Sequence, residues 1–304
     1  MKKYIYLLLA LITFATSQAQ EFKTLTYFIN DTIELQLDLF LPKTKSTEKL
    51  PLIIHVHGGG FAVGGREWGH HISKYAASKG YAAASISYSL YMKGKNFSCN
   101  GSLPEKIKAI QIAANQLQQA VIFFHKNKDV FNIDTDKIFL SGSSAGAEAV
   151  LHAAFWDSKM MKVYRDRLPE GFKYAGVISG AGAIMDLNLI NKNNLVPVLL
   201  FHGSSDTTVP YATAAHHNCA PNSSGWLMLF GSYSIYNHII TLNGNTKLIT
   251  YCGGAHEYSD EVFAKTPQLA VDFMNGVLNK EKQQSHIIVP TGKTNENDTY
   301  KFCD

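Results

Sequence analysis

The sequence predicts an α/β fold with a mostly parallel sheet and helices on both of its faces. Short apolar stretches such as Leu52–Val56 and Val196–Phe201 have the composition of buried strands. The segment Pro104–Lys126 has apolar residues at three- and four-residue spacing, and Pro104 suits a first helical turn. Strand and helix signals alternate in this way along the chain, which is typical of parallel strands joined by helical crossovers.

The other expected elements follow the same alternation. Further strands are expected at Leu35–Leu41, Tyr81–Tyr88, Lys137–Leu140, Tyr174–Ile178 and Leu248–Tyr251, and further helices from Ala145 to about Trp156 and from about Thr266 to Leu278. No internal repeat or linker divides this pattern, so one domain is expected over residues 20–280, followed by a loosely held polar tail over residues 281–304. The pattern of strands and helices is least clear over residues 211–245.

Composition excludes several classes of protein. The 304 residues are 46% hydrophobic and 17% charged, which is typical of a packed globular protein and argues against disorder. There are 28 lysines and arginines against 24 acidic residues, a net charge of +4, with no run of five basic residues. A nucleic-acid partner is therefore not expected.

The chain begins with the features of a secretory signal peptide. Lys2 and Lys3 precede the apolar stretch Tyr4–Ala15, and the small residues Ser17 and Ala19 predict cleavage after position 19. Twelve apolar residues would span roughly 18 Å as a helix, less than the roughly 30 Å bilayer core. We therefore expect a secreted or periplasmic protein of 304 − 19 = 285 residues, with no membrane span after cleavage.

Export would allow the four cysteines to form disulfides. Because none of them forms a C-x-x-C pair, neither a zinc site nor a redox motif is indicated. Cys219 and Cys252 are expected in loops at the same end of the sheet, which makes them candidates to pair. Three pairings of Cys99, Cys219, Cys252 and Cys303 stay open.

The first motif with chemical content is G-S-S-A-G at residues 142–146. It lies directly between the expected strand Lys137–Leu140 and the helix that starts at Ala145. A serine on such a strand-to-helix turn exposes its hydroxyl above the sheet, and the helix start adds N–H groups where negative charge develops. Ser144 is therefore the predicted nucleophile. Ser141 and Ser143 flank it but lack its central position between glycines.

The second motif, H-G-G-G-F at residues 57–61, follows the strand Leu52–Val56. Its glycines expose backbone N–H groups, which predicts that Gly58, Gly59 or Gly60 forms an oxyanion hole together with Ala145. A phosphate loop is less compatible with this stretch, because neither G-K-[ST] nor G-x-G-x-x-G is present.

Two further motifs place an acid and a base on loops that follow strands. Asp206 lies in H-G-S-S-D-T-T-V-P after Val196–Phe201, and His256 lies in G-G-A-H-E after Leu248–Tyr251. An imidazole can take the proton of Ser144 during attack and return it to the leaving group, while a carboxylate on its other nitrogen fixes the tautomer. We therefore predict a Ser144–His256–Asp206 triad.

Several other polar residues compete for these roles. Asp186 is the alternative acid. His55 and His57 could share a strand face, but no third ligand lies near them, so no metal site is expected. The remaining candidates are expected on the surface, in loops, at a helix start or as supports of the motifs; they are His70, His71, His202, His216, His217 and Asp260.

The four motifs H-G-G-G-F, G-S-S-A-G, H-G-S-S-D-x-x-V-P and G-G-A-H together resemble the carboxylesterase and lipase-like branch of the α/β-hydrolase superfamily. The resemblance spans residues 30–280 and is strongest to bacterial esterases related to hormone-sensitive lipase and to secreted feruloyl or acetyl-xylan esterases. It implies an eight-stranded sheet and hydrolysis through an acyl-enzyme with no cofactor. Ser143 and Ala147 depart from the family pattern, in which an acidic residue and a glycine are frequent. No insertion suggests a large lid.

The expected function is therefore that of a serine esterase acting on a small or carbohydrate-linked carboxylic ester. A peptidase or amidase of the same fold and an inactive hydrolase-like binding protein are the alternatives. Acyl and alcohol specificity and the oligomeric state stay open. Four aromatic residues are candidates to line a pocket, although such residues belong to the core more often than to a pocket; they are Phe61, Trp68, Trp156 and Tyr211.

Overall fold

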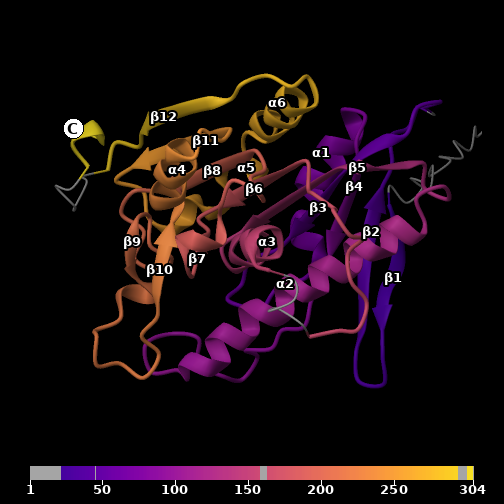
Figure 1. Cartoon of the computed structure of the whole chain (residues 1–304). Helices are drawn as coiled ribbons and strands as arrows, with labels where there is room; N and C mark the ends of the chain where they lie inside the picture. Colours follow the sequence, from indigo (N-terminus) through magenta and orange to yellow (C-terminus); the bar gives the residue numbers. More distant parts are fainter. Residues whose placement is uncertain (1–21, 45, 158–162, 294–299, 304) are drawn as a thin grey trace, which may run out of the picture.

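The computed structural model describes residues 22–44, 46–157, 163–293 and 300–303. The expected signal peptide, Met1 to Ala19, lies outside them. A nine-stranded sheet forms the centre of the molecule, with the order β1-β2-β4-β3-β5-β6-β8-β11-β12 (Figure 1). Its strands are β1 (Lys23–Ile29), β2 (Glu34–Phe40), β3 (Leu50–Val56), β4 (Ala82–Ile86), β5 (Ile133–Ser143), β6 (Gly176–Gly180), β8 (Val198–Gly203), β11 (Thr246–Cys252) and β12 (Gln284–Pro290).

The sheet is mostly parallel, and its strand order reverses at β3. The pairs β1–β2 and β2–β4 are antiparallel, whereas each pair from β4 across to β12 is parallel. The chain runs from β3 to β4 on one side and then crosses to β5 on the other side of β3. Crevices at the carboxyl ends of strands beside such a reversal are the usual location of sites in open α/β sheets.

Helices cover both faces of the sheet (Figure 1). One face carries α2 (Leu103–Lys126), α3 (Ala145–Phe155) and α4 (Ser232–Thr241), and the other carries α1 (His70–Ser78), α5 (Glu261–Ala264) and α6 (Pro267–Leu278). In β3, Leu52 and Ile54 pack into the core on the first face and Ile53 into the core on the second. This alternation explains why the strand is apolar throughout: both of its faces are buried.

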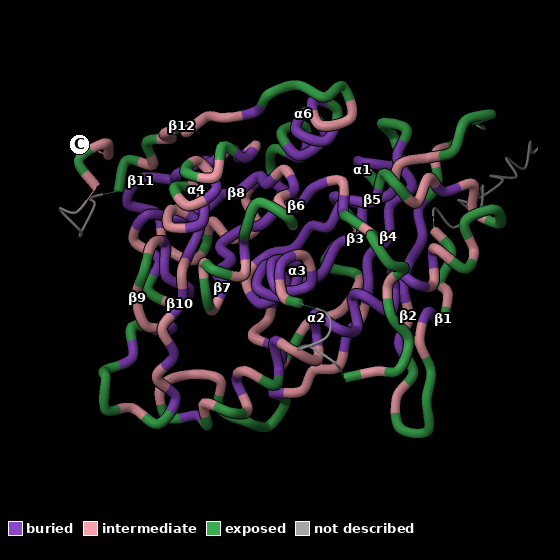
Figure 2. The backbone as a smooth tube through the Cα atoms, viewed as in Figure 1, coloured by how far each residue is buried: buried purple, intermediate pink, exposed green. Residues whose placement is uncertain are grey.

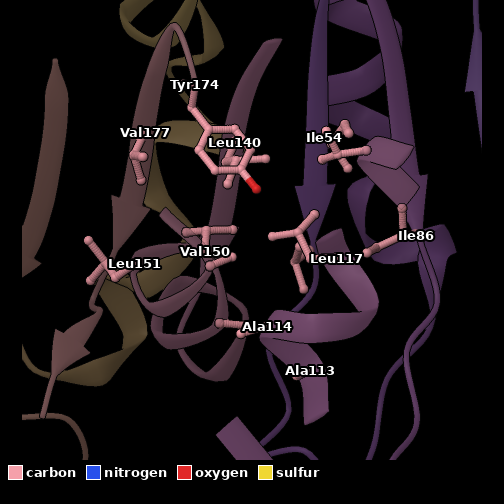
Figure 3. Close-up of a cluster of buried hydrophobic side chains, with 14 of the residues drawn as sticks. Ile54, Ile86, Ala113, Ala114, Leu117, Leu140, Val150, Leu151, Tyr174 and Val177 are labelled. Atoms are coloured by element: carbon pink, nitrogen blue, oxygen red, sulfur yellow. The ribbon is translucent and has the colours of Figure 1, made fainter. Parts of the chain in front are cut away.

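The larger core lies between the sheet and the helices α2 and α3. Figure 3 shows Ile54 and Leu140 of adjacent strands facing Leu117 of α2 and Val150 of α3. Figure 2 shows the central strands buried along their lengths, whereas the edge strands β1 and β12 are largely half-buried or exposed. The core therefore supports the middle of the sheet, where the strand order reverses.

The expected mostly parallel arrangement is confirmed, and each strand and helix expected from the sequence is present with shifted ends. The expected number of eight strands is wrong, because the described sheet has nine. Residues 281–304 do not form only a loose tail, since β12 pairs in parallel with β11 along its whole length. The weakly patterned residues 211–245 contain α4 and two strands of a small second sheet, β9 (Thr213–Ala215) and β10 (Met228–Gly231), which β7 (Ala183–Ile184) completes.

Two disulfides join the four cysteines, and the candidate pairing of Cys219 with Cys252 is wrong. Cys99 pairs with Cys219, and Cys252 at the end of β11 pairs with Cys303. Cys219 and Cys252 do lie towards the same end of the sheet, but each is bonded to a segment that the sequence pattern did not place. Within the described residues, no helix combines the length and apolar character needed to cross a bilayer.

Candidate active site

Ser144 lies on the sharp turn between β5 and α3. Its backbone angles, φ 52° and ψ −124°, are unusual for a residue with a side chain, and its N–H donates to the carbonyl of Gly180 over 2.8 Å. A Cβ on Gly142 would lie 2.5 Å from the backbone of Gly146, and one on Gly146 would lie 2.1 Å from the carbonyl oxygen of Val56. Both glycines of the motif are therefore required by close backbone contacts, which hold the turn beside the end of β3.

The structure brings Ser144, His256 and Asp206 together. The Oγ of Ser144 is 2.8 Å from Nε2 of His256, and Nδ1 of His256 is 2.7 Å from Oδ2 of Asp206. Asp206 follows β8, while His256 begins the short 3-10 helix η4 (His256–Asp260) after β11. Since β8 and β11 are adjacent parallel strands, their carboxyl ends present both side chains at the same edge of the sheet.

The carboxylate of Asp206 is held on both of its oxygens. Oδ1 accepts the N–H groups of Thr208 and Val209 over 2.8 and 3.1 Å, and Oδ2 accepts from Nε2 of His202 over 3.2 Å as well as from His256. Burial raises the pKa of Asp206, but the hydrogen bonds from His202 and His256 outweigh this effect and hold it well below its usual value. This carboxyl is therefore ionised across the physiological pH range.

The glycine loop after β3 lies directly beside Ser144. A Cβ on Gly58 would come within 3.2 Å of the Ser144 Cβ, and Gly59 has φ +102° with the Val63 carbonyl so close that a side chain would clash. The ring of Tyr88 stacks on His57, and its O–H donates to the carbonyls of His57 and Gly58. The carbonyl side of the loop is thus anchored in the protein interior.

The opposite side of the loop supplies hydrogen-bond donors. Within the described part of the chain, no hydrogen bond is donated by the N–H groups of Gly58, Gly59, Gly60 or Ala145. Ala145 is the first residue of α3, where N–H groups have no partner within the helix. The arrangement offers backbone donors and a helix N-terminus next to the hydroxyl of Ser144.

A cavity of about 1050 Å³ opens onto Ser144, His256 and the glycine loop. Among the four aromatic candidates only Trp68 lines it. Phe61 is fully buried against Phe97, which lines the cavity in its place. The other two pack elsewhere, Trp156 against His152 and Tyr211 with its hydroxyl on Thr250.

The competing residues have other partners. Asp186 accepts the N–H of Asn188 at the start of the short 3-10 helix η2 (Leu187–Leu189), and it does not line the cavity. His55 contacts the hydroxyl of Ser141 over 3.1 Å, and His70 pairs with Asp38. In the described residues, no group of three or more His, Cys, Asp or Glu is arranged to hold a metal ion.

Three of the residues expected on the surface, in loops or at a helix start also line the cavity. His216 is not a surface residue: it is 1% exposed and, with His217, lines the cavity. Asp260 does precede the short helix α5, but it also lines the cavity and hydrogen-bonds with Ser143. Burial raises the pKa of Asp260 to about 6. The carboxyl of Asp260 therefore lies beside Ser143 at the cavity wall.

Sequence reasoning missed Glu148, a fully buried carboxyl on the cavity wall. Its signal in the sequence is a lone acid within the apolar helix A-G-A-E-A-V-L, four residues after Ser144 and so on the same helix face. Burial raises the pKa of Glu148 to about 8, against the opposing effect of Lys106. At neutral pH the folded protein therefore holds this group mainly in its neutral form.

Replacing Glu148 by glutamine is expected to remove a pH dependence of stability. Between pH 4.5 and about 8 the folded state keeps a proton that the unfolded state has lost, so the free energy of unfolding falls as pH rises. The difference between Glu148→Gln and wild type should grow by up to about 1.4 kcal/mol per pH unit across that window. The groups around Glu148 that share the titration are Lys106, His216, Asp206 and Tyr88. Urea unfolding at pH 5, 6, 7 and 8 measures this difference, and parallel curves for the two proteins would contradict it.

The disulfide Cys99–Cys219 joins the two loops that form one wall of the cavity. Phe97 lies two residues before Cys99, and His216 lies three residues before Cys219, with the two rings 5.1 Å apart. The bond therefore fixes the position of this wall relative to Ser144.

A Cys99→Ser/Cys219→Ser double variant is expected to lose about 2 to 4 kcal/mol of stability. Its kcat/KM for a hydrolysed ester should fall about 10-fold, since small displacements of positioning groups reduce rate strongly. The matched Cys252→Ser/Cys303→Ser variant should lose comparable stability with a smaller change in kcat/KM. Equal effects of both variants on kcat/KM would count against a specific role in the cavity wall.

The fold and the geometry of this site define an α/β-hydrolase of the carboxylesterase and lipase-like type. The family model BD-FAE matches residues 37–195, just over half of the chain, and the chain belongs to the BD-FAE family. The expected α/β-hydrolase fold is confirmed by solved structures of esterase 2 from Thermogutta terrifontis. The propionate-bound form has a TM-score of 0.62 at 16% identity, covering 84% of this chain and 94% of that one, and the form phosphorylated by paraoxon has a TM-score of 0.63 with the same coverage and identity.

Curated relatives are also named as esterases. A probable isoprenylcysteine alpha-carbonyl methylesterase of Arabidopsis thaliana is 24% identical over 214 residues, which cover 58% of this chain and 47% of the relative. The juvenile hormone esterase of Tribolium castaneum is 24% identical over 196 residues, which cover 59% and 29%. The chain thus spans about half the length, or less, of these curated relatives.

Proposed function

We propose that the protein is a serine hydrolase that cleaves carboxylic esters through Ser144, His256 and Asp206. The observation that carries the proposal is the hydrogen-bonded series from Asp206 Oδ2 through the His256 ring to Ser144 Oγ, with distances of 2.7 and 2.8 Å, at the floor of a cavity. Membership of the BD-FAE family and the esterase names of the relatives support the same reaction.

The reaction would begin with attack by the oxygen of Ser144 on the ester carbonyl carbon. The proton of Ser144 passes to Nε2 of His256, and ionised Asp206 stabilises the imidazolium that forms. The negative oxygen of the tetrahedral intermediate receives hydrogen bonds from N–H groups of Gly58, Gly59 or Gly60 and from Ala145, each worth about 10²-fold to 10³-fold in rate.

The two halves of the reaction balance without any cofactor. When the intermediate collapses, the carbon–oxygen bond to the alcohol breaks and His256 returns its proton to the departing oxygen. Water then attacks the acyl-Ser144 ester, gives one proton to His256 and adds its oxygen to the acyl carbon. Collapse releases the carboxylic acid and restores the Ser144 hydroxyl.

The proposed substrates are esters of short or carbohydrate-linked acids, including feruloyl esters, and the proposed location is outside the cytoplasm. A cavity of about 1050 Å³ accommodates such groups, and its polar wall residues suit hydroxylated ones. The pairing of all four cysteines supports an oxidising compartment.

Hydrolysis of 4-nitrophenyl acetate, butyrate and ferulate by the purified protein tests the activity, and a fluorophosphonate probe tests the nucleophile. We expect turnover and a covalent adduct that peptide mapping assigns to Ser144. An adduct on another residue would overturn the assignment of Ser144. Faster cleavage of the matched 4-nitroanilides would indicate an amidase instead, while neither turnover nor labelling of folded protein would indicate an inactive hydrolase scaffold.

A further inference from the structure

The cavity wall contains buried polar groups that the proposed ester chemistry does not use. Glu148 is 0% exposed, and no described residue gives either of its carboxyl oxygens a hydrogen-bond partner. His216 is 1% exposed, and its Nδ1 is likewise without a partner among the described residues. Both residues line the cavity that opens onto Ser144.

Three segments bring these groups together. Glu148 lies one turn along α3 from Ser144, and His216 begins the short 3-10 helix η3 (His216–Asn218), where its N–H donates to the carbonyl of Leu227 over 2.8 Å. The His216 Nε2 atom is 3.5 Å from Oε1 of Glu148, which is too long for a hydrogen bond. The charge of Lys106 of α2 also acts on Glu148, but its Nζ donates to the carbonyl of Gly225 over 2.8 Å.

Burying these two polar side chains without hydrogen-bond partners destabilises the folded protein. A buried polar atom without a partner destabilises the folded state, and nearly all such atoms in folded proteins have a partner. Here three unpartnered atoms from two residues, the two oxygens of Glu148 and Nδ1 of His216, lie beside one cavity. These atoms are positioned to form hydrogen bonds with a polar group bound in the cavity.

The charges around the site select a neutral polar group. Lys106 and ionised Asp206 act on Glu148 with opposite charges, so a ligand of either sign is attracted by one of them and repelled by the other. A hydroxyl can donate to a carboxyl oxygen and accept from an imidazole N–H at the same time. It therefore satisfies both side chains without bringing in a charge.

We infer that Glu148 and His216 form a subsite that binds a hydroxyl group of the substrate close to the ester bond. Four residues of α-helix rise roughly 6 Å, so the hydroxyl would lie a few bonds from the carbonyl attacked by Ser144. The inference rests on the proposed ester hydrolysis and specifies its substrates as hydroxylated esters. The hydroxyl can belong to the acid or to the alcohol, and the two sources require separate tests.

Two matched pairs of esters separate these sources. Methyl 3-hydroxybutyrate against methyl butyrate tests a hydroxyl on the acid, and 2-hydroxyethyl butyrate against ethyl butyrate tests one on the alcohol. In pH-stat assays, wild type should favour the hydroxylated member of one pair by about 10-fold to 100-fold in kcat/KM. Glu148→Leu should reduce that ratio to within about 2-fold of unity, and Glu148→Gln should retain part of it.

Thr246→Val is the matched control. The Thr246 hydroxyl is also fully buried without a described partner, but it lies at the start of β11, outside the cavity. Its replacement should leave both activity and the hydroxyl preference unchanged. If Glu148→Leu does not fold, His216→Leu replaces it and should remove the same preference.

Failure of the subsite and failure of the proposed activity give different results. Turnover of the plain butyrate esters without any hydroxyl preference, or with a preference that survives Glu148→Leu, would overturn the subsite and leave the esterase proposal intact. If wild type hydrolyses none of the four esters, calorimetry with the Ser144→Ala variant decides the subsite. Tighter binding of a hydroxylated ester, lost on adding Glu148→Leu, would support it, and equal binding of both members of each pair would overturn it.

Discussion

Replacement of Ser144 by alanine is expected to lower kcat for 4-nitrophenyl butyrate by about 10⁵-fold to 10⁶-fold. The variant removes the oxygen that lies 2.8 Å from Nε2 of His256 and leaves the backbone turn in place. Because alanine has the same Cβ as serine, the strained angles at position 144 affect both proteins equally. The change in rate therefore reports the loss of the nucleophile rather than a change of fold.

The measurement needs a control serine that lies outside the cavity. Ser179 of β6 has a buried hydroxyl without a described hydrogen-bond partner and does not line the cavity, so Ser179→Ala should keep wild-type kcat. Fluorophosphonate labelling should disappear only in Ser144→Ala. Residual activity of Ser144→Ala above about one hundredth of wild type would contradict the proposed mechanism, because water alone cannot replace a positioned nucleophile at that rate.

The sequence predicted those parts of the fold in which local signals agree with one another. The apolar run of β3, the glycines around Ser144 and the amphipathic pattern of α2 each depend on nearby residues, and the structure contains all three elements. The grouping of Ser144, Asp206 and His256 was also predictable, since each follows an expected strand of one parallel sheet. Their assignment as a triad stays a prediction until activity is measured.

Other parts depend on contacts that no local pattern records. β12 does carry a local strand signal, the β-branched run Ile287–Val289, but its place at the edge of the sheet depends on its pairing with β11. The partner of Cys219 depends on how α2 and the loop before it cross the sheet, which brings Cys99 to a distance of 5.1 Å between Cα atoms. Glu148 is a different case. It stands out because its buried carboxyl oxygens have no described hydrogen-bond partner, which only the three-dimensional structure shows.

Replacement of Asp206 by asparagine is expected to lower kcat about 10⁴-fold, through the tautomer of His256. Oδ1 of Asp206 accepts two backbone N–H groups, from Thr208 and Val209, so the amide oxygen of asparagine must take that position. The amide nitrogen then lies where Oδ2 was and donates to Nδ1 of His256. This leaves the proton of His256 on Nε2, the atom that has to accept the proton of the nucleophile.

The same substitution disturbs His202. In the unsubstituted protein, Nε2 of His202 donates to Oδ2 of Asp206 over 3.2 Å and to the Val209 carbonyl over 3.1 Å. In the variant, the N–H at Nε2 of His202 would point at the amide N–H₂ of asparagine, so two donors would face each other. Moving the proton of His202 to Nδ1 would avoid this but would lose the hydrogen bond to Val209. Asp206→Asn should therefore also lose about 1 to 3 kcal/mol of stability, measured by urea unfolding at pH 7.

Asp186→Asn is the control for this prediction, since Asp186 is the other acid that the sequence allowed and its carboxyl accepts from the N–H and the side-chain amide of Asn188. It should keep wild-type kcat and kcat/KM. If Asp206→Asn stays active and Asp186→Asn loses its activity, Asp186 and not Asp206 is the acid of the triad. A loss of stability in Asp206→Asn without a loss of kcat would mean that the carboxylate holds the loop after β8 but does not control the proton on His256, and the proposed triad would then be wrong at its third member.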